Sequence, residues 1–219
     1  MGRKVNPIGF RMGIVNTWDS RWFADNKQYK VFVMEDNFLR DLFFNRIKGA
    51  GLTKVEIERS INTINVILHV VRPGLVIGRG GQGMEDLKKY VQKSLLAFRQ
   101  KKSGLLDKKN VLKIDLKVEP VKEPNLNARF MATQIAEQLQ KRLPHKRVVN
   151  FALEKMMNSG ARGAKIIIAG RIAGAEIARR ETYKKGTLPL STIREDIDFA
   201  SVPSLTKSGY IGIKVWICR

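Results

Sequence analysis

The apolar positions of the chain change their spacing along its length, and each change marks a new structural element. A stripe with helical spacing follows a cap at Asp36 or Asn37 and ends at Gly49. Alternation of apolar and polar side chains, broken only by the apolar Ile67, then predicts two strands, over residues 55–58 and 64–70. The first folded region is therefore expected to begin with a helix that leads into two strands.

A glycine-rich turn separates these strands from a longer helix. Pro73 breaks the chain after the second strand, and the sequence PGLVI predicts a short apolar helical turn. The next stripe predicts a helix from about Gly81 to Phe98, and alternation over residues 112–119 predicts a further strand. The order is helix, strand, strand, short turn, helix, strand.

Residues beyond a proline-containing linker form a second group of elements. Two helical stripes are followed by strand-like runs at 164–172, 179–186, 193–201 and 210–217. Two helices before about four strands predict a two-layer α/β sandwich, which places the chain in the α+β class. The expected organisation is a basic N-terminal arm (1–36), a first domain (37–119), a linker (120–124) and a second domain (125–219).

Charge narrows the class of partner. The chain has 41 Lys and Arg residues against 20 Asp and Glu, which gives a net charge of +21. Such an excess produces a positive potential that attracts polyanions. No apolar run reaches the ~18 residues of a membrane-spanning helix, and the first residues lack the apolar core of a secretory signal. We therefore expect a cytoplasmic protein that binds nucleic acid and no membrane.

Reactive side chains are too few and too scattered for an enzyme. A single cysteine, Cys218, allows neither an internal disulfide nor a thiolate metal site. His69 falls in an alternating strand and His145 follows a proline among basic residues, so neither has a nucleophile to activate. Glu85 and Asp86 fall in the first turn of a helix, where carboxylates stabilise the positive helix end. We expect no catalytic activity, no metal and no cofactor.

The glycines near residue 80 first suggest a dinucleotide site. Gly78, Gly80 and Gly83 form G-x-G-x-x-G, which in that role follows a full strand and precedes an acidic residue by about 20 positions. Only three apolar residues separate Gly78 from the preceding Pro-Gly break, and the sequence KKSG occupies the place of the acidic residue. The context for a dinucleotide site is therefore missing.

The same glycines also form G-x-x-G, from Gly78 to Gly81, between two helical segments, as in the KH fold. Glycines there admit a sugar-phosphate backbone because they lack Cβ atoms. Arg79 at the tip adds charge-assisted hydrogen bonds. This interpretation is favoured, and strands that precede the loop are typical of a type II KH domain.

Several longer segments carry a more specific resemblance. MGRKVNPIGFRMGI with WDSRWFA, RPGLVIGRGG, GRIAGAEIARRETYKKGTLPLSTIREDIDF and GYIGIKVWI together resemble the bacterial family of small-ribosomal-subunit protein number three (uS-three). The likeness covers nearly the whole chain, and residues 170–199 are its most discriminating part. It implies a structural protein in the head of the small subunit that holds 16S ribosomal RNA beside small-subunit proteins ten and fourteen. It also implies that the protein lines the channel through which messenger RNA enters.

The resemblance assigns RNA contacts to individual residues. Lys146 and Arg147 match the family's paired basic positions, where they help to unwind messenger RNA, whereas Asn150 and Phe151 replace residues that are usually basic. Unwinding is therefore expected to be weaker, or to shift to Arg142 and Lys155. The candidate RNA-binding residues are Arg3, Lys4, Arg11, Gly78, Arg79, Gly80, Gly81, Arg142, Lys146, Arg147, Arg171, Arg179 and Arg180.

Two other functions remain open. A KH factor for RNA processing or regulation that acts off the ribosome would share the loop but not residues 170–199, and it would not sediment with small subunits. A DNA-lesion lyase, an activity of eukaryotic members of the resembled family, needs a lysine amine of lowered pKa. Borohydride trapping on abasic DNA would reveal that activity.

Overall fold

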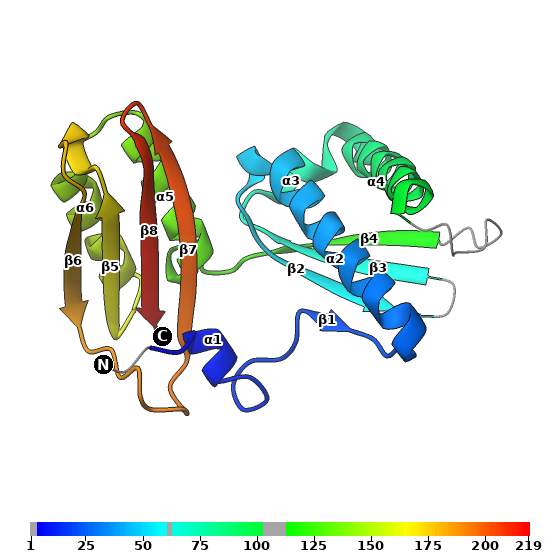
Figure 1. The fold of residues 1–219 in the computed structure, drawn as a ribbon, viewed down its shortest axis with the longest axis horizontal. Helices are drawn as coiled ribbons and strands as arrows, with labels where there is room; N and C mark the ends of the chain where they lie inside the picture. The colour runs from blue at the N-terminus through cyan, green and yellow to red at the C-terminus, as the bar shows by residue number, and fades with distance from the viewer. Residues whose placement is uncertain (1–3, 61–62, 103–112) are drawn as a thin grey trace. The chain divides into compact units, whose positions relative to one another are not determined.

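Two compact units make up the protein in a computed structural model, which describes residues 4–60, 63–102 and 113–219. The first unit spans residues 18–122, and the second combines residues 4–17 with 123–219 (Figure 1). The predicted arm is therefore not one segment, because each unit takes part of it. None of the described helices is long and apolar enough to span a bilayer.

The first unit contains one sheet and its helices. In chain order its elements are β1 (Ser20–Arg21), α2 (Asn26–Arg46), the 3-10 turn η1 (Lys48–Ala50), β2 (Leu52–Arg59), β3 (Thr63–Val70), α3 (Pro73–Ile77), η2 (Arg79–Gly81), α4 (Gln82–Lys102) and β4 (Lys113–Pro120). The strands lie in the order β1-β2-β3-β4, with β2 and β3 antiparallel and β3 and β4 parallel. This succession of elements confirms the predicted type II KH arrangement.

Alternation along the strands supplies the core of this unit. Val66, Leu68 and Val70 of β3 are completely buried. Phe43 of α2 and Val91 of α4 belong to the same cluster, so both helices pack on one face of the sheet. This packing holds the turn between α3 and α4 at one end of the layer of helices.

Helix α2 begins at Asn26, well before the predicted cap at Asp36 or Asn37. Asp36 is 2% exposed inside the helix, where its carboxylate accepts hydrogen bonds from Trp22 Nε1 at 2.8 Å and Arg59 Nε at 2.9 Å. The polar residue that suggested a cap instead joins the segment before α2 to strand β2. Sequence spacing alone does not distinguish a buried carboxylate of this kind from a capping one.

The second unit is a sandwich of two layers. Its elements are α1 (Pro7–Phe10), η3 (Pro124–Leu126), α5 (Ala128–Gln140), α6 (His145–Asn158), β5 (Gly163–Gly170), η4 (Ile172–Gly174), β6 (Arg179–Gly186), β7 (Ile197–Thr206) and β8 (Gly209–Cys218). The strands pair antiparallel in the order β6-β5-β8-β7, and α5 and α6 pack on one face (Figure 1). The predicted two helices on a four-stranded sheet are confirmed, although β7 begins at Ile197 rather than at residue 193.

Arg11 attaches the N-terminal segment to the second unit and is completely buried. Its guanidinium donates hydrogen bonds to the backbone carbonyls of Pro7, Pro189, Leu190, Thr192 and Glu195. A guanidinium enclosed by carbonyls is not available to a phosphate, so the prediction that Arg11 binds RNA is wrong. The sequence shows its charge but not the loop that closes over it.

Candidate nucleic-acid interface

The G-x-x-G turn leads from α3 into α4. Gly78 ends α3 with φ of 70°, and Gly80 and Gly81 follow with φ of 60° and 82°. Glycine adopts these left-handed conformations at little cost. Arg79 is exposed between them. The turn therefore combines one cation with a stretch of backbone that carries no side chains.

The glycines of this stretch have two different roles. A Cβ on Gly83 would lie 2.7 Å from the carbonyl oxygen of Val76, so Gly83 is needed for α4 to begin against α3. A Cβ on Gly80 or Gly81 would meet nothing within 4 Å. Helix packing explains Gly83, whereas Gly80 and Gly81 leave free space into which a sugar-phosphate backbone fits. The N-terminus of α4 adds the positive end of its helix dipole.

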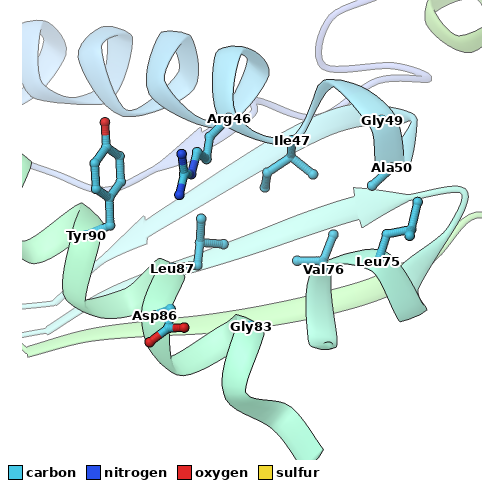
Figure 2. A pocket seen from close by; sticks show the side chains of 10 residues that line it. All are labelled: Arg46, Ile47, Gly49, Ala50, Leu75, Val76, Gly83, Asp86, Leu87 and Tyr90. Carbon is cyan, nitrogen blue, oxygen red and sulfur yellow. The ribbon is translucent and has the colours of Figure 1, made fainter. Parts of the chain in front are cut away.

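A hollow of about 450 Å³ lies between the end of α2 and the pair α3 and α4 (Figure 2). Ile47, Val76 and Leu87 form its apolar part, and Arg46 and Asp86 contribute one charge of each sign. Balanced charges give no net attraction for phosphate. The turn, and not this hollow, is therefore the candidate phosphate site of the first unit.

The first turn of α6 presents Lys146 and Arg147 to solvent. That turn contains no acidic residue. The positive end of the helix dipole lies at the same place. Two cations at a helix N-terminus form a suitable surface for an anionic chain.

Phe151 lies one helical turn beyond Arg147 and is 50% exposed. The Nζ atom of Lys155 lies 4.5 Å from the centroid of its ring. An exposed ring with a cation over it is a group on which an unpaired base can stack. The exposed side of α6 therefore offers contacts for both phosphates and bases.

Arg142 and Arg171 are distant in sequence but line one cavity of about 370 Å³ in the second unit. Lys207, from the hairpin between β7 and β8, lines it too, and no carboxylate does. Arg142 and Ala173 have φ of 59° and 56°, the two positive values for non-glycine residues in the described part of the chain. Backbone of this kind costs about 1–3 kcal/mol and clusters at functional sites. Sequence reasoning missed Lys207, because nothing in a hairpin lysine indicates which arginines fold beside it.

The remaining predicted residues do not gather at one place. Arg179 is 49% exposed and pairs with Glu181 at 2.8 Å. Arg180 is exposed and follows it on β6, so it points to the other face of the sheet. Lys4 is exposed, and Arg3 lies outside the described residues. The predicted set is thus divided among the turn, the start of α6, the basic cavity and the sheet.

Neither histidine belongs to a catalytic arrangement. His69 Nε2 lies 3.5 Å from Glu56 Oε1 in the first unit. His145 Nε2 lies 3.0 Å from Glu181 Oε2, although the two atoms are not aligned for a hydrogen bond. The hydroxyl of Tyr183 donates to Glu181 and lowers the pKa of that carboxyl, while burial and this bond raise the pKa of Tyr183 to about 12. Across the described ranges, no three His, Cys, Asp or Glu residues gather where they could hold a metal ion.

Comparisons with known proteins agree with the division into two units. A family model described as KH domain matches residues 39–126, and one described as ribosomal protein S3, C-terminal domain, matches residues 135–217. Small ribosomal subunit protein uS3 of Clostridium acetobutylicum is 41% identical over 217 residues, which cover 99% of this chain and 91% of that protein. The uS3 proteins of Caldicellulosiruptor bescii and Acetivibrio thermocellus are each 41% identical over all 219 residues of this chain. The matched region covers 92% of the first protein and 90% of the second. The chain therefore belongs to the uS3 family of ribosomal proteins.

Proposed function

We propose that the protein is a structural component of the small ribosomal subunit and binds 16S ribosomal RNA there. Relatives that are similar over nearly their full length are named as small-subunit proteins. A net charge of +21 suits a partner made of phosphates. The observation that carries the proposal is the open backbone of Gly80 and Gly81 beside the exposed Arg79. As expected for a ribosomal protein family, the role is structural rather than enzymatic.

Ribosomal RNA is held at two places in this proposal. The turn from Gly78 to Gly81 grips a stretch of backbone, because phosphates approach closely where Cβ atoms are missing. The basic cavity binds a second stretch through Arg142 and Arg171, since its lining has no carboxylate to compete with phosphate. Lys4, Arg179 and Arg180 are proposed to add contacts at the surface.

Helix α6 is proposed to contact messenger RNA in the channel through which it enters. Lys146, Arg147 and the helix N-terminus hold phosphates, and Phe151 stacks on bases that are not paired. Contacts of this kind favour a single strand over a hairpin, because only the single strand offers free bases. Small-subunit proteins ten and fourteen are the proposed protein neighbours, as the family resemblance implies.

The channel role is tested with the double variant Lys146→Gln and Arg147→Gln in ribosomes. Translation of a message that contains a stable hairpin should slow, while an unstructured message and subunit assembly should be unaffected. The matched control is Arg162→Gln with Arg194→Gln, which removes the same charge from exposed residues outside the first turn of α6. If both messages slow equally, or if the control slows the structured message as much, the proposed role of α6 is wrong.

A further inference from the structure

Helices α5 and α6 cover one face of the sheet of the second unit, and the short α1 lies against β7. Ile166 and Ile168 of β5 and Ile213 and Val215 of β8 enter the core shared with α5 and α6. Because side chains alternate along a strand, the residues between them point away from the helices. No helix of the described part of this unit covers that side of β5, β6 and β8 (Figure 1). We call this surface the open sheet face; alternate residues of 165–169, 180–184, 199–205 and 210–216 form it.

One row of the open sheet face crosses all four strands. The register pairs Lys184 with Lys165, Lys165 with Trp216, and Trp216 with Phe199. The rings of Trp216 and Phe199 lie 5.0 Å apart at an angle of 39°. Lys165 Nζ lies 5.6 Å from the centroid of the Trp216 ring. The row therefore places a pair of aromatic rings beside two lysines.

The open sheet face carries a third aromatic ring at the opposite end of β8. Ala169 of β5 and Gly212 of β8 are paired in the register, so the face carries little side-chain bulk at this position of the two central strands. Tyr210 is 70% exposed at the start of β8. Trp216 follows it six positions later along the strand, a distance of roughly 20 Å. A ligand on this face therefore meets aromatic rings at both ends of β8.

Charge on the open sheet face has one sign. Its four cations are Arg180, Lys165, Lys184 and Lys214. Glu181 and Asp198 are the acidic residues of these strands, and alternation directs both of them to the helix side. The strands themselves therefore place no carboxylate among these cations; Glu195, from the loop before β7, lies 3.9 Å from Cys218 Sγ at the end of the face and pairs with Arg162.

The cations of the open sheet face repel one another, and this repulsion affects the pKa of Lys165. Burial lowers the pKa of its ammonium, and the nearby positive charges of Lys4, Arg180 and Lys184 lower it further. A partner that brings negative charge to the face relieves that repulsion.

We propose that the open sheet face binds a single-stranded segment of RNA, with bases stacked on its aromatic rings and phosphates held by its cations. The proposal rests on the RNA partner proposed above but concerns a surface separate from the turn, the basic cavity and α6. Sheets that hold single-stranded RNA in other proteins combine the same two features, aromatic rings on an uncovered face and a positive groove or edge.

Unpaired RNA fits this face better than the other partners that carry negative charge. A duplex offers phosphates, but its bases are stacked on one another and leave the rings of Trp216 and Tyr210 without partners. An acidic protein surface neutralises the lysines, but its carboxylates gain nothing from the rings. A single strand supplies both flat bases and phosphates.

Directed cleavage in assembled small subunits tests the surface. The change Ser201→Cys adds a thiol in the row next to Trp216, at a position that is exposed and opposite Lys214. Native Cys218 is buried, and burial raises the pKa of its thiol, so an iron–EDTA reagent attached under native conditions labels the new position. Wild-type protein treated in the same way gives the background.

Hydroxyl radicals from this position should cut 16S ribosomal RNA in an unpaired stretch, severalfold above background. The labelled protein could be incorporated without such cuts, or with cuts only in paired helices. Either result would overturn the proposal that the open sheet face binds single-stranded RNA, and would leave the proposed function intact. Absence of the wild-type protein from the small-subunit peak would instead overturn the proposed function, and this surface with it.

Binding of isolated full-length protein to oligouridylate gives a second test. Lys184→Gln with Lys214→Gln should reduce the slope of log affinity against log salt by roughly 1.4, about 0.7 for each lost contact with a single strand. Tyr210→Ser should weaken binding of oligouridylate roughly five- to 150-fold and leave an RNA duplex of matched length unaffected. The control for the loss of charge is Arg162→Gln with Arg194→Gln. The control for the loss of an aromatic ring is Tyr29→Ser, because Tyr29 of the first unit is 56% exposed. Equal effects of the controls would contradict the proposal.

Discussion

Replacement of Arg11 by methionine removes the guanidinium that joins the N-terminal segment to the loop before β7. The side chain is fully buried, and its shortest hydrogen bonds, both 2.7 Å, reach the carbonyls of Thr192 and Glu195. Methionine is unbranched and flexible, so it fills the same space without donors. The partly buried carbonyls of Thr192 and Glu195 then lose their donor.

The expected loss of stability follows from these orphaned acceptors. A buried group left without its hydrogen bond costs about 1–3 kcal/mol. The two carbonyls at 2.7 Å alone account for roughly 2–6 kcal/mol on this scale. When the loop moves, water hydrates these carbonyls and recovers part of the lost free energy. Arg11→Met should therefore lower the free energy of unfolding of the second unit by ~3–5 kcal/mol.

Cys218 provides a local assay for this opening. It is the only cysteine in the chain, and its Sγ atom lies 3.9 Å from Glu195 Oε2. Burial, and then the charge of Glu195, raises the pKa of the thiol, so it reacts slowly at neutral pH in the folded state. Labelling proceeds through the opened state, whose population follows the local free energy of opening. A loss of ~3 kcal/mol corresponds to labelling roughly a hundredfold faster.

Arg162→Met is the matched control. Arg162 pairs with the carboxylate of the same Glu195 at 3.1 Å, but its side chain is 66% exposed. Exposed ion pairs of this kind contribute about 0–1 kcal/mol. Urea unfolding should therefore separate the two variants clearly. Equal labelling rates for wild type and Arg11→Met, or equal losses in both variants, would refute the structural role of Arg11.

Other predictions concern the first unit and one tyrosine. Arg59→Met leaves the buried Asp36 without its cationic partner and Glu35 with Arg99 alone, and should lower the free energy of unfolding by ~3–5 kcal/mol, whereas Arg21→Met, at a side chain 48% exposed, should cost under ~1 kcal/mol. Hydrogen exchange of first-unit peptides along a urea series measures both, and equal losses would contradict the buried network. Gly83→Ala should cost about 1–3 kcal/mol in the same assay because its Cβ meets backbone, while Gly49→Ala enters open space and should cost little. Tyr183 should ionise near pH 12 in an absorbance titration, and Tyr183→Phe should remove that step. Its folded-state pKa is raised, so its contribution to stability is complete below pH 10 and is lost between pH 10 and 12; a tyrosine that titrates near 10 at this position would contradict the contact with Glu181.

Elements that depend on local pattern were predictable from the sequence. The bounds of α3 at Pro73–Ile77 and β6 at Arg179–Gly186 coincide with the expected runs, because proline and glycine punctuate both. The glycine turn was predictable for the same reason. Its division into packing and open glycines was not, since only the backbone of α3 decides which Cβ atoms would clash.

Features that depend on pairing between distant segments were not predictable. Arg11 and Arg180 look equally basic in the sequence, yet one is enclosed by carbonyls and the other is exposed. Lys165 and Trp216 meet because β5 and β8 pair in one particular register. Alternation indicates that each strand has two faces, but only the register shows which side chains share a row.

Sedimentation of a cell lysate tests the central claim most directly, that this protein is an RNA-binding component of the small ribosomal subunit. The account predicts that the protein sediments in the small-subunit peak at moderate salt and leaves that peak when ribonuclease degrades the RNA. Its appearance only in light fractions, free or with RNAs other than 16S, would contradict the account and favour a KH factor that acts off the ribosome.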